Sequence, residues 1–121
     1  MFKSETQTLR QFQVPVAQVI AATGELIAAI GEAALSAQLL VVESSVADSA
    51  DTAAEMRPLV IVLPEHVYQT DAGNFEALAR DIRSRLMRVV DGELDPVELR
   101  RRLETLMAEA EAQRPSWNDE L

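Results

Sequence analysis

Apolar residues dominate the chain from Val14 to Val42 and recur there with a period of seven. The segments AQVIAAT, GELIAAI and GEAALSA follow one another from Ala17, Gly24 and Gly31. Seven residues make two helical turns, so each repeated position forms a stripe along one side of a helix. The pattern predicts one long helix from about Pro15 to Met56, which is about 40 residues or on the order of 60 Å.

Small residues form the most informative of these stripes. Ala17, Ala21, Gly24, Ala28 and Gly31 are three or four residues apart and would share one face of the predicted helix. Glycine inside a helix costs about 1 kcal/mol relative to alanine, and close approach of a second helix is the usual compensation. We therefore interpret the stripe as a helix-packing interface, either within the domain or with another chain.

The segment 39–46 also permits a different interpretation. Its Leu-Leu-Val-Val run favours a strand, which a loop over 44–55 would connect to the apolar segment 59–63. In that case the protein would be α+β, with a small hairpin made of residues 39–46 and 59–63.

Prolines and capping residues divide the rest of the chain. Pro58 and Pro64 enclose five apolar residues and predict a buried extended segment. A helical hairpin should follow: its first helix carries an apolar stripe, and its second begins at Asp95-Pro96, a strong N-terminal signal. The stripe of the first helix consists of Phe75, Leu78, Ile82, Leu86 and Val89. The expected fold is therefore mainly α, with a single helical domain over 14–114, an N-terminal arm over 1–13 and an acidic tail over 115–121.

Charge is unevenly distributed along this acidic chain. The net charge is -9, and no Lys or Arg occurs between residues 11 and 56, whereas seven of the eleven cations lie between residues 80 and 102. Acidic residues interleave with these arginines, which is typical of a solvated face. The alternative is a charged partner surface, which would consist of Arg80, Arg83, Arg88, Arg101 and Arg102. It would contact an acidic surface, such as the cation-free half of another copy, and nucleic acid is not favoured.

Candidate chemistry is sparse. The chain has no cysteine and one histidine, His66, and it contains no phosphate-binding loop or nucleophile motif. We predict no catalytic residues, no cofactor and no metal, and a protein that is not an enzyme. The start of the chain does not resemble a secretory signal peptide, so we expect a cytoplasmic protein or one within an assembled particle such as a virion.

The apolar N-terminal segment suggests the function. It would carry more apolar surface than one strand and two short helices can cover, which indicates a structural subunit of a multi-subunit complex, for example a virion head or tail component. Its partners would be other copies of itself or other subunits. A membrane- or surface-associated helical protein is an alternative, although Glu25 and Glu32 would be costly inside a bilayer. A small regulatory protein-binding module is another.

Overall fold

The protein is an α/β domain, seen in a computed structural model that describes residues 14–114. Strands and helices alternate along the chain, and every strand pairing is parallel. The elements are β1 (Val16–Ile20), α2 (Gly24–Ser36), β2 (Leu40–Ser44), α3 (Ser49–Met56), β3 (Val60–Pro64), α4 (Glu65–Thr70), α5 (Ala72–Asp81), β4 (Arg85–Val89) and α6 (Pro96–Gln113).

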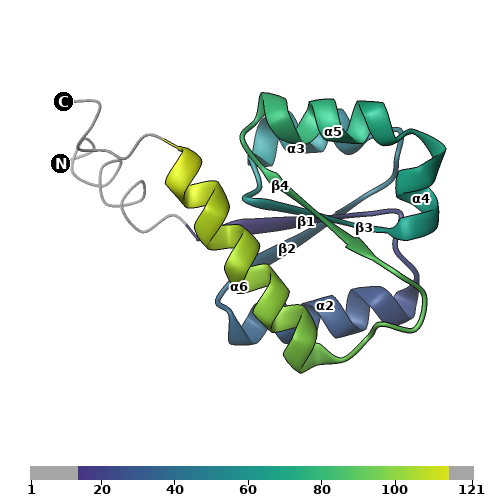
Figure 1. Ribbon diagram of the computed structural model, residues 1–121, viewed down its shortest axis with the longest axis vertical. Coiled ribbons are helices and arrows are strands. Elements are labelled where there is room, and N and C mark those ends of the chain that lie inside the picture. The colour runs from purple at the N-terminus through teal and green to yellow at the C-terminus, as the bar shows by residue number, and fades with distance from the viewer. Residues whose placement is uncertain (1–13, 115–121) are drawn as a thin grey trace, which may run out of the picture.

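The four strands form one sheet in the order β2-β1-β3-β4. The chain moves from β1 to one edge, then crosses back over β1 to β3 and continues to β4. Parallel crossovers are almost always right-handed, so a reversal of direction places the connecting helices on opposite faces. Accordingly α2 lies on one face and α3, α4 and α5 on the other, and α6 returns to the face of α2 (Figure 1).

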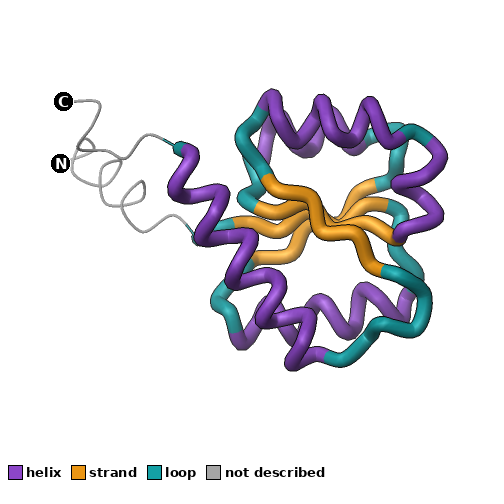
Figure 2. The backbone as a smooth tube through the Cα atoms, viewed as in Figure 1, coloured by secondary structure: helices purple, strands orange, loops and turns teal. Residues whose placement is uncertain are grey.

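Each face of the sheet has its own apolar core, and the sheet lies between the two helical layers (Figure 2). Alternate side chains of β1 and β3, among them Val19 and Val62, pack against α2 and α6. The remaining side chains, such as Ile20 and Ile61, pack against α3, α4 and α5. The central strands are therefore buried on both sides, which is typical of parallel sheets.

The prediction of a mainly α protein with one long N-terminal helix is wrong. Residues 16–44 form a strand, a helix of 13 residues and a second strand. The chain leaves β1 through Ala21, whose φ is 51°, and Thr23 then caps α2 by accepting a hydrogen bond from the Leu26 amide. All five residues of β1 are buried, so the strand lacks the alternation that would have distinguished it from a helix.

The alternative of a small hairpin is also wrong, although residues 40–44 do form a strand. β2 runs parallel to β1, with Val16 opposite Leu40 and Ile20 opposite Ser44. It does not contact β3 in the sheet, because β1 lies between them. The loop proposed over 44–55 is largely helix α3.

The C-terminal half combines confirmed and overturned predictions. The extended segment between the prolines is β3, and α6 begins as predicted, with the Asp95 side chain accepting a hydrogen bond from the Val97 amide. The first helix of the hairpin ends at Asp81, however, and Leu86 and Val89 belong to strand β4. A turn through Arg83, whose φ is 57°, separates the two elements.

Two further predictions concern the ends of the chain and a membrane. The arm over 1–13 and the tail over 115–121 lie outside the described residues. Among residues 14–114, no helix is both long enough and apolar enough to cross a bilayer. The apolar stretch 14–42 is instead divided among β1, α2 and β2.

Candidate interaction surface

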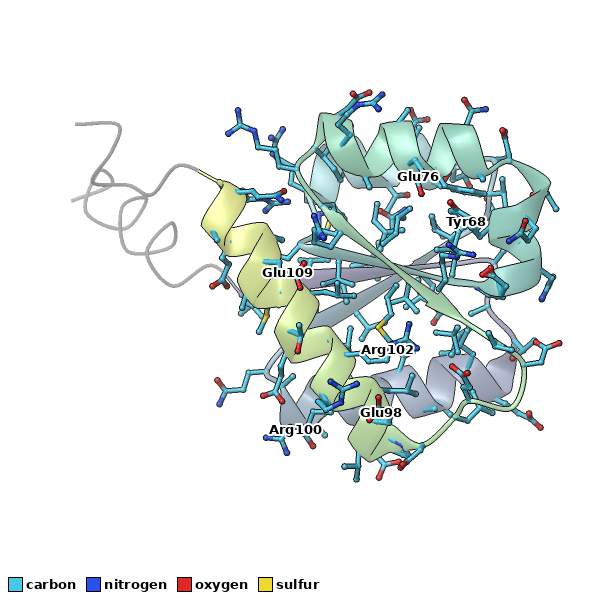
Figure 3. The ribbon with its side chains drawn as sticks, in the orientation of Figure 1. Tyr68, Glu76, Glu98, Arg100, Arg102 and Glu109 are labelled. Atoms are coloured by element: carbon cyan, nitrogen blue, oxygen red, sulfur yellow. The ribbon has the colours of Figure 1, made fainter. Side chains whose placement is uncertain are left out.

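An arginine-lined groove follows the outer edge of β4, between α5 and α6. It has a volume of about 530 Å³ and is open to solvent. Four arginines line it together with one carboxylate, Glu76, and the half-buried side chains of Leu86 and Leu106 lie between them. The arginines are Arg80, Arg83, Arg85 and Arg88. Figure 3 shows the β4 edge facing the viewer, with Glu76 on the side of α5 and Glu109 on the side of α6.

Two of the four arginines are held by neighbouring carboxylates. Arg85 lies 2.8 Å from Glu109 of α6, and Arg88 forms a forked pair with Glu65, with Nε–Oε1 and Nη2–Oε2 distances of 2.7 and 2.6 Å. The hydrogen bonds from Arg88 lower the pKa of the Glu65 carboxyl, and a hydrogen bond from Gln69 adds to this effect. These pairs fix the side chains along β4 in defined positions.

Tyr68 extends the same network onto α5. The Arg88 guanidinium carbon lies 4.0 Å from the centre of the Tyr68 ring, which is a cation–π distance. The Tyr68 hydroxyl donates to Oε1 of Glu76 at 2.6 Å, and that hydrogen bond, with burial, raises the pKa of the phenol. α4, α5 and β4 are thus joined at the carboxyl end of the groove.

Arg80 and Arg83 differ from Arg85 and Arg88 in their charge partners. Both side chains are exposed, and neither forms an ion pair within residues 14–114. Ser84, which also lines the groove, is 6% exposed, and its hydroxyl has no hydrogen-bond partner within the described part of the chain. The amino end of the groove therefore contains cationic and polar groups whose interactions are incomplete.

The fold brings together only part of the predicted charged partner surface. Arg80, Arg83 and Arg88 line the groove, and Arg102 reaches its border from α6, where Nη2 donates to the Arg88 carbonyl oxygen at 2.8 Å. Arg101 points elsewhere and pairs with Glu98 on the exposed side of α6. Arg85, which the predicted set of five arginines did not include, completes the groove.

The small-residue stripe does not lie on one helix. Ala17 is buried in β1 and Ala21 follows that strand, whereas Gly24, Ala28 and Gly31 lie on the outer or half-buried sides of α2. A Cβ built on Gly24 or Gly31 would meet no atom within 4 Å. Close helix packing within this domain therefore does not explain either glycine.

The excess of apolar surface expected for the N-terminal segment is also absent. Val19, Ile20, Leu26 and Ile30 are all buried by the domain itself, whereas Leu35 is 81% exposed and Val14 and Leu40 are about half exposed. The main apolar residues of this segment therefore need no neighbouring subunit to cover them. An assembly role has to rest on another observation.

Arg114 is a structural residue that sequence reasoning missed. Its guanidinium donates to the carbonyl oxygens of Arg57, Pro58, Ile82 and Arg83, at distances between 2.7 and 3.3 Å. Burial lowers its pKa, and the nearby Arg57 and Arg83 add to this effect. Arg57 and Arg83 both have positive φ, so Arg114 ties the end of α6 to the two strained turns that precede β3 and β4.

The carboxyl ends of the strands offer the other place where a doubly wound sheet commonly binds ligands. A pocket of about 280 Å³ lies there, lined by Thr23, Glu25, His66 and Asp91 among others. His66 Nδ1 lies 3.9 Å from Asp91 Oδ1, both side chains are largely exposed, and the Thr23 hydroxyl is used to cap α2. No group of three metal-ligating side chains converges in this pocket or elsewhere in residues 14–114.

Fold and site together define a small doubly wound α/β domain with a charged groove at one sheet edge. In comparisons with known proteins, no family model, curated protein or solved structure matches this chain.

Proposed function

We propose that the protein is a non-enzymatic assembly subunit that binds other protein chains through the groove along β4. One observation carries the proposal: Arg80 and Arg83 stand at the end of a groove that already contains two paired arginines, and no carboxylate of the described chain neutralises them. A partner that brings carboxylates into this groove would supply the ion pairs that Arg80 and Arg83 lack within the described residues.

The lining specifies the chemistry of that partner. Guanidinium groups bind carboxylates in a planar, two-pronged geometry, which gives orientation as well as attraction. Leu86 and Leu106 add apolar surface between the charges. The groove therefore suits an acidic protein surface that also presents apolar side chains, and electrostatic complementarity of this kind contributes mainly to specificity and association rate.

A labelled peptide in which Glu and Val alternate is a suitable probe, with a Gln and Val peptide as its uncharged counterpart. Fluorescence anisotropy should show binding of the acidic peptide alone, and raising the salt to about 0.5 M should weaken it because surface charges are then screened. The double variant Arg80→Gln/Arg83→Gln should lower the affinity about tenfold or more.

The matched control is Arg100→Gln/Arg101→Gln, which removes the same charge from the exposed side of α6. Those two arginines pair with Glu104 and Glu98 and lie outside the groove. Equal loss of binding in both double variants would show that only net charge matters, and it would overturn the proposal.

The other functional interpretations stay predictions. A regulatory binding module would use the same groove for an acidic partner. Binding of the acidic peptide is therefore expected both for an assembly subunit and for a regulatory module. A virion component and a surface-associated protein are not favoured by any particular contact in residues 14–114.

A further inference from the structure

The strand order places the acidic and the arginine-rich parts of the sequence at opposite edges of the sheet. Residues 14–56 contain six carboxylates and no Lys or Arg, and they supply edge strand β2 with its flanking helices α2 and α3. The arginine groove lies along β4, at the opposite edge. The two edges of one molecule thus carry complementary charge.

The complementary groups also lie at the same level along the sheet. α3 contacts β1 and leads into β3, whereas α5 contacts β4 and leads into it, so both helices lie on one face and end at the amino ends of the strands (Figure 1). Glu55 and Asp51 are exposed on α3, and Arg80 and Arg83 are exposed at the end of α5. A copy placed beside another in the same orientation would bring these carboxylates to these guanidinium groups.

Apolar side chains match on that same face. In β4, Leu86 faces the layer of α5 and is half-buried. In β2, Ser44 accepts a hydrogen bond from Gln18 on that face, so alternation places Val42 and Leu40 there too. Leu40 is 49% exposed because the short helix α3 does not cover it.

We propose that the partner of the groove is a second copy of this chain, which presents its β2 and α3 edge to the β4 and α5 edge of the first. This inference rests on the proposed function and names its partner. The contact is heterologous, since different surfaces of the two copies meet, and repetition leads to a ring or an open chain of subunits.

Charge argues against the symmetric arrangements. In a symmetric pair, two β4 edges would bring two arginine-lined grooves together, and two β2 edges would bring together two surfaces that carry Glu43 and Glu55. Like charges in direct opposition are destabilising. The net charge of -9 repels whole molecules at long range, but at physiological salt the screening length is about 8 Å, so local contacts decide the orientation.

Two neutralised variants of the full chain test this arrangement. Arg80→Gln/Arg83→Gln removes two of the four arginines of the groove, and Asp51→Asn/Glu55→Gln removes two carboxylates of α3 at the opposite edge. Sedimentation velocity of the wild-type protein should show concentration-dependent association. Each variant alone should associate about tenfold more weakly or not at all. An equimolar mixture should form a heterodimer of wild-type affinity that does not grow further, because each variant retains one intact surface.

The possible outcomes separate this inference from the proposed function. Wild-type association of the Asp51→Asn/Glu55→Gln variant alone would indicate a symmetric contact and overturn the heterologous one. A wild-type protein that stays monomeric but binds the acidic peptide would overturn self-association and leave the proposed function standing. A wild-type protein that neither associates nor binds the peptide would overturn both. The Arg100→Gln/Arg101→Gln variant should associate like the wild type.

Discussion

The two edge strands of this sheet are protected in different ways. At β4 the outward carbonyl of Arg88 is occupied by Arg102, Arg85 is paired with Glu109, and helices α5 and α6 stand on either side. At β2 the strand itself is half exposed, and Leu40 is only partly covered. Charged side chains discourage unspecific strand pairing, whereas an apolar edge invites contact. Under the proposed self-association, β4 would select its partner by charge and β2 would offer the surface that β4 binds.

The largest difference in unfolding free energy between the two edges should come from replacing one leucine by alanine at each edge. Leu103 of α6 is fully buried beneath the β4 edge, and Leu103→Ala should lower the free energy of unfolding by about 2–5 kcal/mol. Leu40→Ala at the β2 edge should change it by about 0.5 kcal/mol or less. Urea denaturation measures both values, and similar losses would show that the β2 edge is more tightly packed than its exposure indicates.

Arg114 should have the next largest effect, because it secures the turn that leads into β4. Arg114→Met leaves four carbonyl oxygens without their donor and should cost about 1–3 kcal/mol in urea denaturation. Arg114→Lys keeps the charge but cannot reach all four oxygens, so it should recover only part of the loss. A wild-type stability for the Met variant would contradict the structural role given to this residue.

A smaller effect is expected where Arg102 covers the β4 backbone. Arg102→Met removes the hydrogen bond to the Arg88 carbonyl and should cost about 1 kcal/mol. The neighbouring substitution Arg101→Met removes an exposed pair with Glu98 and should leave the stability nearly unchanged, because solvent screens such a pair. Thermal unfolding of the two variants measures the difference. Equal melting temperatures would show that the hydrogen bond from Arg102 does not protect the β4 edge.

The pH dependence of the Glu65–Arg88 pair should be the smallest effect. Because the folded-state pKa of Glu65 lies below its ordinary value of 4.5, the pair stabilises the fold above that pH and the stabilisation is lost as pH falls through the lowered value. The melting-temperature difference between the wild type and Glu65→Gln should therefore be largest near neutral pH and shrink below about pH 4.5. In an Arg88→Gln background, Glu65→Gln should show no such trend.

The sequence revealed the local signals of this fold better than it revealed strands β1 and β4. Asp95-Pro96 predicted the start of α6, and the two prolines around residues 59–63 predicted β3, because capping and proline chemistry act locally. β1 and β4 were assigned to helices. β1 is buried on both faces and has no alternation, and β4 continues the apolar spacing of α5, with the break set by a left-handed Arg83 where glycine or asparagine would have been the usual signal.

The candidate site was anticipated only as a set of arginines. Arg80, Arg83 and Arg88 were identified from the concentration of cations between residues 80 and 102. A two-helix hairpin would have grouped them with Arg101, whereas the strand at 85–89 groups them with Arg85. The four hydrogen bonds of Arg114 go to carbonyl groups that are 31 to 57 residues away in the sequence. No pattern along the chain predicts such contacts. Long-range pairing of this kind becomes visible only when the strand order is known.

The buried amide of Gln18 has a consequence for how the strands find their alignment. It is wholly enclosed, and its Nε2 donates to the Ser44 hydroxyl and the Ser49 carbonyl oxygen. If β1 slipped by one residue, this amide would enter the hydrocarbon layer beneath α2 and lose both acceptors, at a cost of about 1–3 kcal/mol. The Gln18 amide thus favours the observed register of β1 over one shifted by a single residue.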